Sequence, residues 1–140
     1  MKAQTNFTIG ALASDAGVNV ETIRFYERKG LLRKPPRKSS GYRQYQAEDS
    51  QRIRFIKRAQ DLGFTLKEIA ELLELDTDPT ATCGDMRGQA ERKLSEVESK
   101  IKDLNRMKKT LKRLADACGE NKKAVQSCRI LDCFESGWRC

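Results

Sequence analysis

The chain has 140 residues, 38% hydrophobic and 34% charged, so it has room for one modest core or for a small domain with an extended element. Its formal charge is +8, and the segment from Arg24 to Arg58 has 12 basic and 3 acidic residues, a net charge of +9. Such a localised basic surface is the footprint of nucleic-acid binding. No apolar run approaches the ~18 residues of a membrane span, and no apolar signal core is visible, so we expect a cytoplasmic protein that does not enter a membrane.

Two short helices are predicted first, around a three-residue turn. Thr8 can cap a helix over residues 9–16, whose apolar residues recur at steps of three and four. Asn19 can cap a second helix over residues 20–29, which Gly30 would end. Two such helices around a short turn indicate a helix-turn-helix, although any pair of short helices could give this pattern.

The next segment is basic and rich in turn-forming residues. Pro35 and Pro36 exclude helix, and the stretch with Tyr42 and Tyr45 looks extended. We therefore expect a small β-hairpin or wing beside the two helices.

Two further helices are expected over residues 48–62 and 64–75. The second carries a capping box in which Thr65 and Glu68 satisfy backbone donors at the helix start. Together with the helix-turn-helix and the wing, they predict a mainly α winged helix-turn-helix DNA-binding domain over residues 7–76.

A long helix is expected over residues 85–118, after a linker over residues 77–84. Leu94, Val97, Ile101 and Leu104 follow heptad spacing, and further apolar residues continue the stripe at steps of three or four. About 33 helical residues would extend about 50 Å. Because the chain offers no comparable partner helix, we expect two copies to form a homodimer through a coiled coil.

The five cysteines are the remaining chemical signal, and the chain has no histidine. In a reducing compartment, clustered thiols are more often metal ligands or redox centres than structural disulfides. Cys83 precedes the long helix, while Cys118 and Cys128 bracket a polar loop after it. In an antiparallel dimer, Cys83 of one subunit would lie beside the other two cysteines of its partner. Thiolate ligation selects soft ions, and three thiolates without histidine suit Hg(II) better than Zn(II).

Three stretches carry a resemblance to a known family. These are TIGALASDAGVNVETIRFYERKGLL, GYRQY and RIRFIKRAQDLGFTLKEIAELL, and with the cysteine pattern they resemble the MerR family of transcriptional activators over about residues 7–130. The resemblance implies a regulator that is not an enzyme and that binds double-stranded promoter DNA as a dimer. It also implies repression without metal, and activation of RNA polymerase by DNA untwisting when metal binds.

On this basis we expect a regulator of a mercury resistance operon, with Hg(II) as the effector ion. A sensor of Zn(II), Cd(II) or Pb(II) that controls an efflux system is the alternative, since nine residues separate Cys118 from Cys128, one more than is usual in the mercury, lead and cadmium sensors of the family. Two hypotheses come from other functional classes. One is a thiol redox enzyme, and the other is a DNA-structuring or metal-buffering protein without promoter specificity.

The expected site residues fall into two sets. The predicted metal ligands are Cys83 in the linker and Cys118 and Cys128, with residues 119–140 forming a metal-binding loop and tail. Cys133 and Cys140 could add ligands, capture metal or lie in a frayed tail. The predicted DNA contacts are Val20, Thr22, Arg24, Tyr26, Arg43 and Tyr45.

Overall fold

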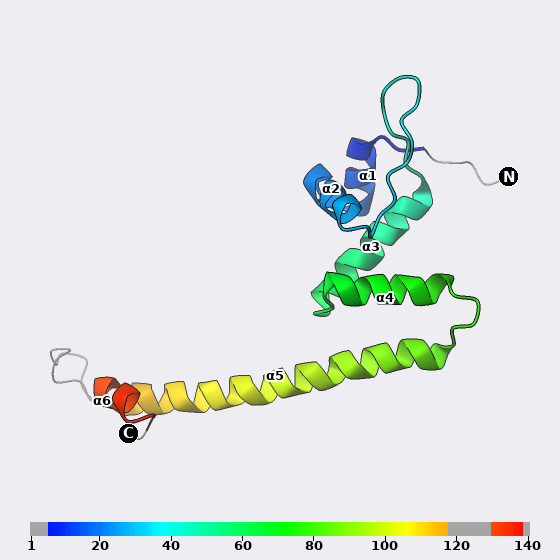
Figure 1. Ribbon diagram of the computed structural model, residues 1–140. Helices are drawn as coiled ribbons and strands as arrows, with labels where there is room; N and C mark the ends of the chain where they lie inside the picture. Colours follow the sequence, from blue (N-terminus) through cyan, green and yellow to red (C-terminus); the bar gives the residue numbers. More distant parts are fainter. Residues whose placement is uncertain (1–5, 118–129, 139–140) are drawn as a thin grey trace. The chain divides into compact units, whose positions relative to one another are not determined.

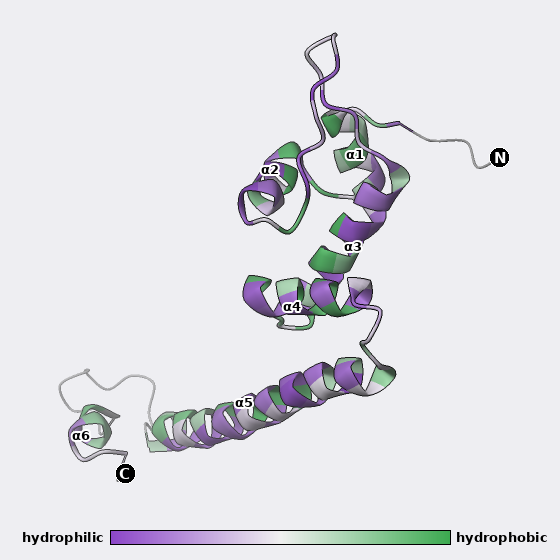
Figure 2. Cartoon of the chain, turned by 45° about the vertical axis from the view of Figure 1, so that its right-hand side comes forward, coloured by the Kyte–Doolittle hydropathy of each residue, from purple (hydrophilic) through white to green (hydrophobic). Residues whose placement is uncertain are grey.

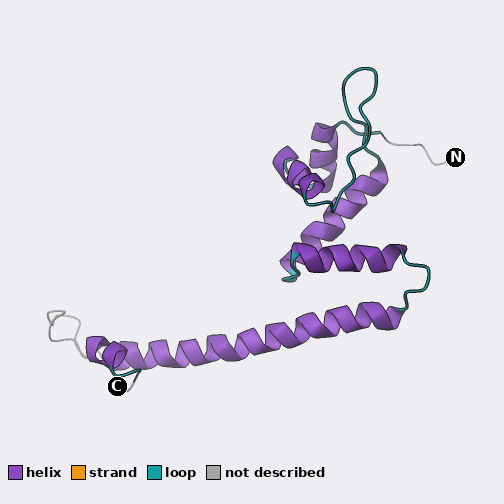
Figure 3. Cartoon of the chain, in the orientation of Figure 1, coloured by secondary structure: helices purple, strands orange, loops and turns teal. Residues whose placement is uncertain are grey.

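A computed structural model describes residues 6–117 and 130–138. The described chain is mainly helical and includes no regular strand (Figure 3). Contacts divide it into two compact units, Met1–Gln89 and Ala90–Cys140. In chain order the helices are α1 (Ile9–Ala16), α2 (Val20–Arg28), α3 (Ala47–Asp61), α4 (Leu66–Thr77), α5 (Cys83–Ala117) and α6 (Ile130–Glu135) (Figure 1).

The predicted helix-turn-helix is confirmed, together with both of its caps. The Thr8 hydroxyl accepts a hydrogen bond from the backbone N–H of Ala11, and the Asn19 side chain accepts one from Thr22. Between the helices, Gly17 has a φ of 70°, a left-handed conformation that glycine adopts without strain. These local signals start both helices where the sequence predicts, and α2 ends at Arg28, one residue before the predicted end.

Helices α3 and α4 complete the core of the first unit. The Asp49 carboxylate accepts from the backbone N–H of Gln46 at the start of α3, and the Thr65 hydroxyl accepts from that of Glu68 at the start of α4. The apolar faces of α1 to α4 converge on one core, together with the residues that follow α2. Its fully buried members include Leu12, Ile23, Ile53, Ile56 and Ile69, all 0% exposed.

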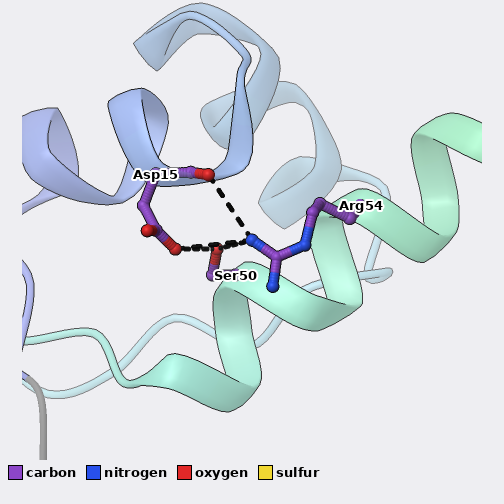
Figure 4. A network of polar contacts seen from close by, with 3 residues as sticks. All are labelled: Asp15, Ser50 and Arg54. Carbon is purple, nitrogen blue, oxygen red and sulfur yellow. Dashed lines mark hydrogen bonds and ion pairs between the residues drawn. The ribbon is translucent and has the colours of Figure 1, made fainter.

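A polar network fastens α1 to α3 beside this core (Figure 4). The Ser50 hydroxyl donates to Asp15 at 2.5 Å, and the Arg54 guanidinium donates to Ser50 at 2.8 Å. Arg54 also reaches the Asp15 carboxylate and backbone carbonyl, each at 3.4 Å. The network fixes the helix-turn-helix on its supporting helix through charged groups whose hydrogen-bonding needs are met locally.

The expected hairpin is present as a wing, residues 33–46, with isolated bridges in place of strands. Phe7 pairs with Tyr45, and Arg37 pairs with Arg43, both antiparallel. The tip turns at Gly41, whose φ of 85° favours glycine. Pro35 and Pro36, in the first arm, have no backbone N–H to donate to a ladder.

Helix α5 begins earlier than the sequence suggests. Thr82 and Asp85 cap it reciprocally, since the Thr82 N–H donates to the Asp85 carboxylate and the Asp85 N–H donates to the Thr82 hydroxyl. Cys83 is therefore the first residue of the helix, not part of the linker. Hydrophobic residues recur along α5 (Figure 2). Six of them are exposed in the single chain: Leu94, Val97, Ile101, Leu104, Met107 and Leu111.

The short α6 was not predicted. It holds Cys133, which is 2% exposed. Phe134 and Trp138 stack edge to face on its exposed side, with ring centroids 4.9 Å apart. Cys133 is thus in ordered structure, and a frayed tail does not describe it. None of the described helices combines the length and the apolar character that a bilayer crossing needs.

Candidate functional site

A groove of about 830 Å³ lies between α2 and the wing. We call it the α2–wing groove. One wall is formed by α2. The other is formed by the wing: its first arm (residues 33–38), its tip around Gly41 and its return arm (residues 42–46), and the start of α1 closes one side. Its lining residues are Thr8, Ile9, Arg24, Glu27, Arg28, Lys34, Arg37, Gly41, Tyr42, Arg43 and Tyr45.

Charge is the dominant property of the groove. Five of its lining residues are cations, contributed by both walls, and Glu27 is the single carboxylate among them. Opposed basic walls concentrate positive potential and attract a polyanion. The tip residue Tyr42 is 73% exposed, so the groove also offers an aromatic side chain to a ligand.

On the helix wall, Arg24 and Arg28 are available to a ligand. Arg24 lies 3.8 Å from Glu21, and both side chains are more than half exposed, so this ion pair holds the guanidinium only weakly. The guanidinium carbon of Arg28 lies 6.0 Å from the ring centroid of Phe25, within the range of a cation–π contact. The helix wall therefore presents one mobile and one supported cation.

On the wing wall, Arg43 and Tyr45 share one acceptor. The Tyr45 hydroxyl donates to Oε2 of Glu27 at 3.2 Å, and Nη1 of Arg43 lies 3.7 Å from the same oxygen. Burial raises the pKa of the Tyr45 hydroxyl, and the negative charge of Glu27 raises it further. Tyr45 therefore stays neutral and keeps its proton on the donated hydrogen bond.

Three of the predicted DNA contacts lie outside the groove lining: Val20, Thr22 and Tyr26. Val20 and Thr22 are half-buried, and the Thr22 hydroxyl donates to Asn19 at 2.8 Å. Tyr26 is 3% exposed and donates to the side chain of Gln60 at 2.7 Å, and its pKa is raised mainly by burial. Tyr45 lines the groove but is 0% exposed. Among the six, Arg24 and Arg43 are the charged side chains that the structure brings together in the groove.

Four charged residues of the groove are not among the contacts that the sequence predicts: Glu27, Arg28, Lys34 and Arg37. The basic residues were visible only as part of a general excess of charge. Glu27 carried a sharper signal, because it follows Ile23 by four positions and so lies on the apolar face of α2. A carboxylate on such a face indicates a buried partner.

Of the predicted metal ligands, the structure describes Cys83. Its thiol is free and exposed at the start of α5. Cys118 and Cys128 lie outside the described residues, as does Cys140. Within residues 6–117 and 130–138, no group of three or more potential ligand side chains comes together. A thiol at this position can supply one ligand, and any further thiolate donors must come from elsewhere.

Comparison with known proteins identifies the family. Residues 7–76 match the MerR HTH family regulatory protein model, and residues 50–114 match the model described as MerR, DNA binding. The mercuric resistance operon regulatory protein of Shigella flexneri is 51% identical over 90% of this chain and 85% of its own length. The HTH-type transcriptional regulator ZntR of Escherichia coli K12 is 39% identical over 94% of each.

A solved structure extends the similarity to three dimensions. A transcription regulator from Ralstonia metallidurans CH34, crystallised in complex with lead(II), superposes with a TM-score of 0.81 at 33% identity, covering 91% of this chain and 98% of that one. The matches include both the helix-turn-helix and most of α5. They agree with the sequence-based expectation of a transcriptional regulator that is not an enzyme. The chain belongs to the MerR family of helix-turn-helix regulatory proteins.

Proposed function

We propose that this protein is a metal-responsive transcriptional regulator of a mercury resistance operon, acting as a dimer on promoter DNA. The observation that carries the DNA-binding part is the α2–wing groove, with five cations on two walls. The 51% identity to a mercuric resistance operon regulatory protein supports the choice of operon. A regulator of this kind would act in the cytoplasm.

The groove cations divide into two roles in this proposal. Arg24 projects from the middle of α2, the helix that enters the major groove in a helix-turn-helix, so it reads a base edge. Arg43 projects from the wing and binds a phosphate, which positions the protein without reading sequence. Tyr26 and Tyr45, being buried, support α2 and the wing, while Val20 and Thr22 lie at the start of α2, where side chains approach bases.

The dimer follows from the exposed stripe of α5. Its large apolar residues are 38% to 62% exposed in the single chain, from Val97 to Leu111. A contiguous apolar stripe of this kind marks a protein–protein contact. Heptad spacing at Leu94, Val97, Ile101 and Leu104 suits a partner helix of the same sequence.

Charge along α5 favours an antiparallel arrangement. Residues 83–99 have 3 basic and 4 acidic side chains, a net charge of −1, whereas residues 100–117 have 7 basic and 2 acidic, a net charge of +5. Parallel helices would align the two basic halves, and like charges repel. Antiparallel helices place each basic half beside the slightly acidic half of its partner.

The effector site combines thiols from both subunits. In an antiparallel dimer the start of α5 meets the end of the partner's α5, so Cys83 joins the partner subunit's Cys118 and the partner subunit's Cys128. The free, exposed thiol of Cys83 is available for this role. Three thiolates without any histidine favour Hg(II). Because a similar regulator was crystallised in complex with lead(II), Pb(II) is an alternative effector, as are Zn(II) and Cd(II).

Regulation then proceeds as a change of populations. Without metal the dimer holds the promoter in a repressed form. Tying the loop after α5 to the start of the partner's helix favours the dimer conformation that untwists the DNA, so RNA polymerase can use the promoter. The DNA contacts themselves need not change.

Transcription in vitro with separate titrations of Hg(II), Cd(II), Zn(II) and Pb(II) tests the proposal. We expect Hg(II) to activate at the lowest concentration, and Cys83→Ser to abolish activation while promoter binding persists. If another of these ions activates transcription at a lower concentration than Hg(II), that ion and not mercury is the effector. Salt-sensitive binding without preference for any promoter would remove the regulatory proposal altogether.

A further inference from the structure

Glu27 is the one carboxylate among the described residues that line the basic α2–wing groove. Its side chain is 2% exposed, although the groove around it is open to solvent. A buried carboxylate is costly unless it is paired and hydrogen-bonded. A negative charge at this place also opposes the binding of a polyanion, so its presence needs a compensating gain.

Two contacts compensate for the burial of Glu27. The Tyr45 hydroxyl donates to Oε2 from within the core, and the Arg43 guanidinium approaches the same oxygen from the groove side. The Arg43 side chain is 32% exposed, which leaves part of its donor set facing the groove. Oε2 of Glu27 thus links α2 to the return arm of the wing.

The backbone of the wing fixes where this arm lies. Phe7 and Tyr45 exchange hydrogen bonds of 2.8 Å in both directions, so the base of the arm cannot slide. Two residues earlier, Arg43 pairs with Arg37 across the wing. With the backbone set, the freedom left to Arg43 is that of its long side chain, and Glu27 restricts that freedom.

We propose that Glu27 is a positioning residue that orients Arg43 for one phosphate of the promoter, and so increases discrimination between promoter and non-specific DNA at the expense of overall affinity. The inference rests on the proposed DNA-binding role of the groove. A pre-oriented guanidinium loses less side-chain freedom on binding the backbone geometry that it fits. DNA with a different backbone geometry does not fit the oriented guanidinium, so its binding is not strengthened. The negative charge of Glu27 still repels its phosphates.

The test compares Glu27→Gln with the wild-type dimer. Glutamine keeps an oxygen that can accept from Tyr45 and removes the ion pair with Arg43. Glu48→Gln, an exposed residue of α3 outside the groove lining, makes the same change in net charge and serves as the control. The probes are a duplex that the wild-type protein selects from a random-sequence library, and poly(dI-dC) as non-specific DNA.

For Glu27→Gln we expect tighter binding to poly(dI-dC) and a ratio of specific to non-specific affinity that falls about two- to tenfold, the range expected for releasing one long side chain at an interface. In an Arg43→Ala background the Glu27→Gln change should leave the ratio unaltered. Glu48→Gln should raise both affinities alike. A merely structural role for Glu27 would weaken both affinities together.

An unchanged ratio in Glu27→Gln, or the same fall in the Arg43→Ala background, would overturn the inference while leaving the proposed function intact. Failure of the wild-type protein to select any duplex would instead overturn the proposed function. If Glu27→Gln does not fold, Glu27→Asp keeps the charge and withdraws the carboxylate. That variant should lower the ratio without tightening non-specific binding, and an unaltered ratio would again overturn the inference.

Discussion

Truncating Ile101 to alanine should weaken the dimer by an amount that the structure allows us to calculate. Ile101 lies in the middle of the exposed stripe of α5 and is 51% exposed in the single chain. Full burial of an isoleucine side chain contributes about 1.5–3 kcal/mol, so about half of this, on the order of 1 kcal/mol, becomes available when a partner helix covers it. Because a symmetric dimer contains two copies of Ile101, the variant loses this burial free energy in both subunits. The total of about 2 kcal/mol corresponds to a roughly 30-fold higher dissociation constant.

Sedimentation equilibrium of the wild type and Ile101→Ala measures this dissociation constant directly. The control is Ser99→Ala, which also introduces alanine, a strong helix former. Ser99 is exposed and lies two residues before Ile101, on the opposite face of α5. We expect the control to dimerise as the wild type does. A wild-type monomer at micromolar concentration, or equal dissociation constants for Ile101→Ala and the wild type, would refute the assignment of the stripe as the dimer contact.

Three further outcomes are expected. Arg24→Ala should weaken promoter binding by about 1–3 kcal/mol and relax the base preference at one operator position. Arg43→Ala should weaken binding to all sequences, promoter DNA more than non-specific DNA, and should reduce the slope of log affinity against log salt concentration by about one unit. Fluorescence anisotropy across a salt series separates the two variants, and unchanged affinity in both would contradict both contacts. Thr65→Ala removes the N-cap of α4 and should lower the free energy of unfolding by about 1 kcal/mol in urea titrations, so an unaltered midpoint would contradict the cap. The pKa of Tyr45 is raised in the folded protein, so the stability that its hydroxyl contributes is present below the unfolded pKa of about 10 and is lost as the pH rises through the folded value. In thermal unfolding at alkaline pH, Tyr45→Phe should therefore lose less stability than the wild type. Equal losses of stability in the two proteins would contradict this.

Local signals in the sequence were sufficient for the first helices. The caps at Thr8, Asn19 and Thr65 depend on side chains within three residues of the groups that they bind, so pattern alone locates them. The start of α5 shows the limit of such reasoning. Thr82 and Asp85 form an equally local capping box, but the acidic, proline-containing stretch before them is typical of a linker. The sequence therefore predicts a helix start at residue 85, two residues later than the observed start at Cys83.

Burial of the tyrosines depended on contacts far apart in the chain. Tyr26 meets Gln60 across 34 positions, and Tyr45 meets Glu27 across 18. An aromatic residue among arginines looks the same in sequence whether it faces DNA or the core, because only tertiary packing decides the matter. Cys133 gave no sequence signal for burial either, since it is the one buried residue within residues 131–138 and its neighbours there are exposed.

In the proposed dimer, each metal ion is held by thiols from two different subunits. Mixed dimers of a Cys83→Ser chain and a Cys118→Ser chain test it most directly. In such a dimer the Cys118→Ser chain keeps Cys83 and the Cys83→Ser chain keeps Cys118 and Cys128, so one complete site survives, whereas each homodimer has none. We predict one Hg(II) per mixed dimer by native mass spectrometry with thiol competitor present, none retained by either homodimer, and mercury-dependent transcription from the mixed dimer. Mixed dimers that retain no more Hg(II) than the two homodimers would contradict the claim.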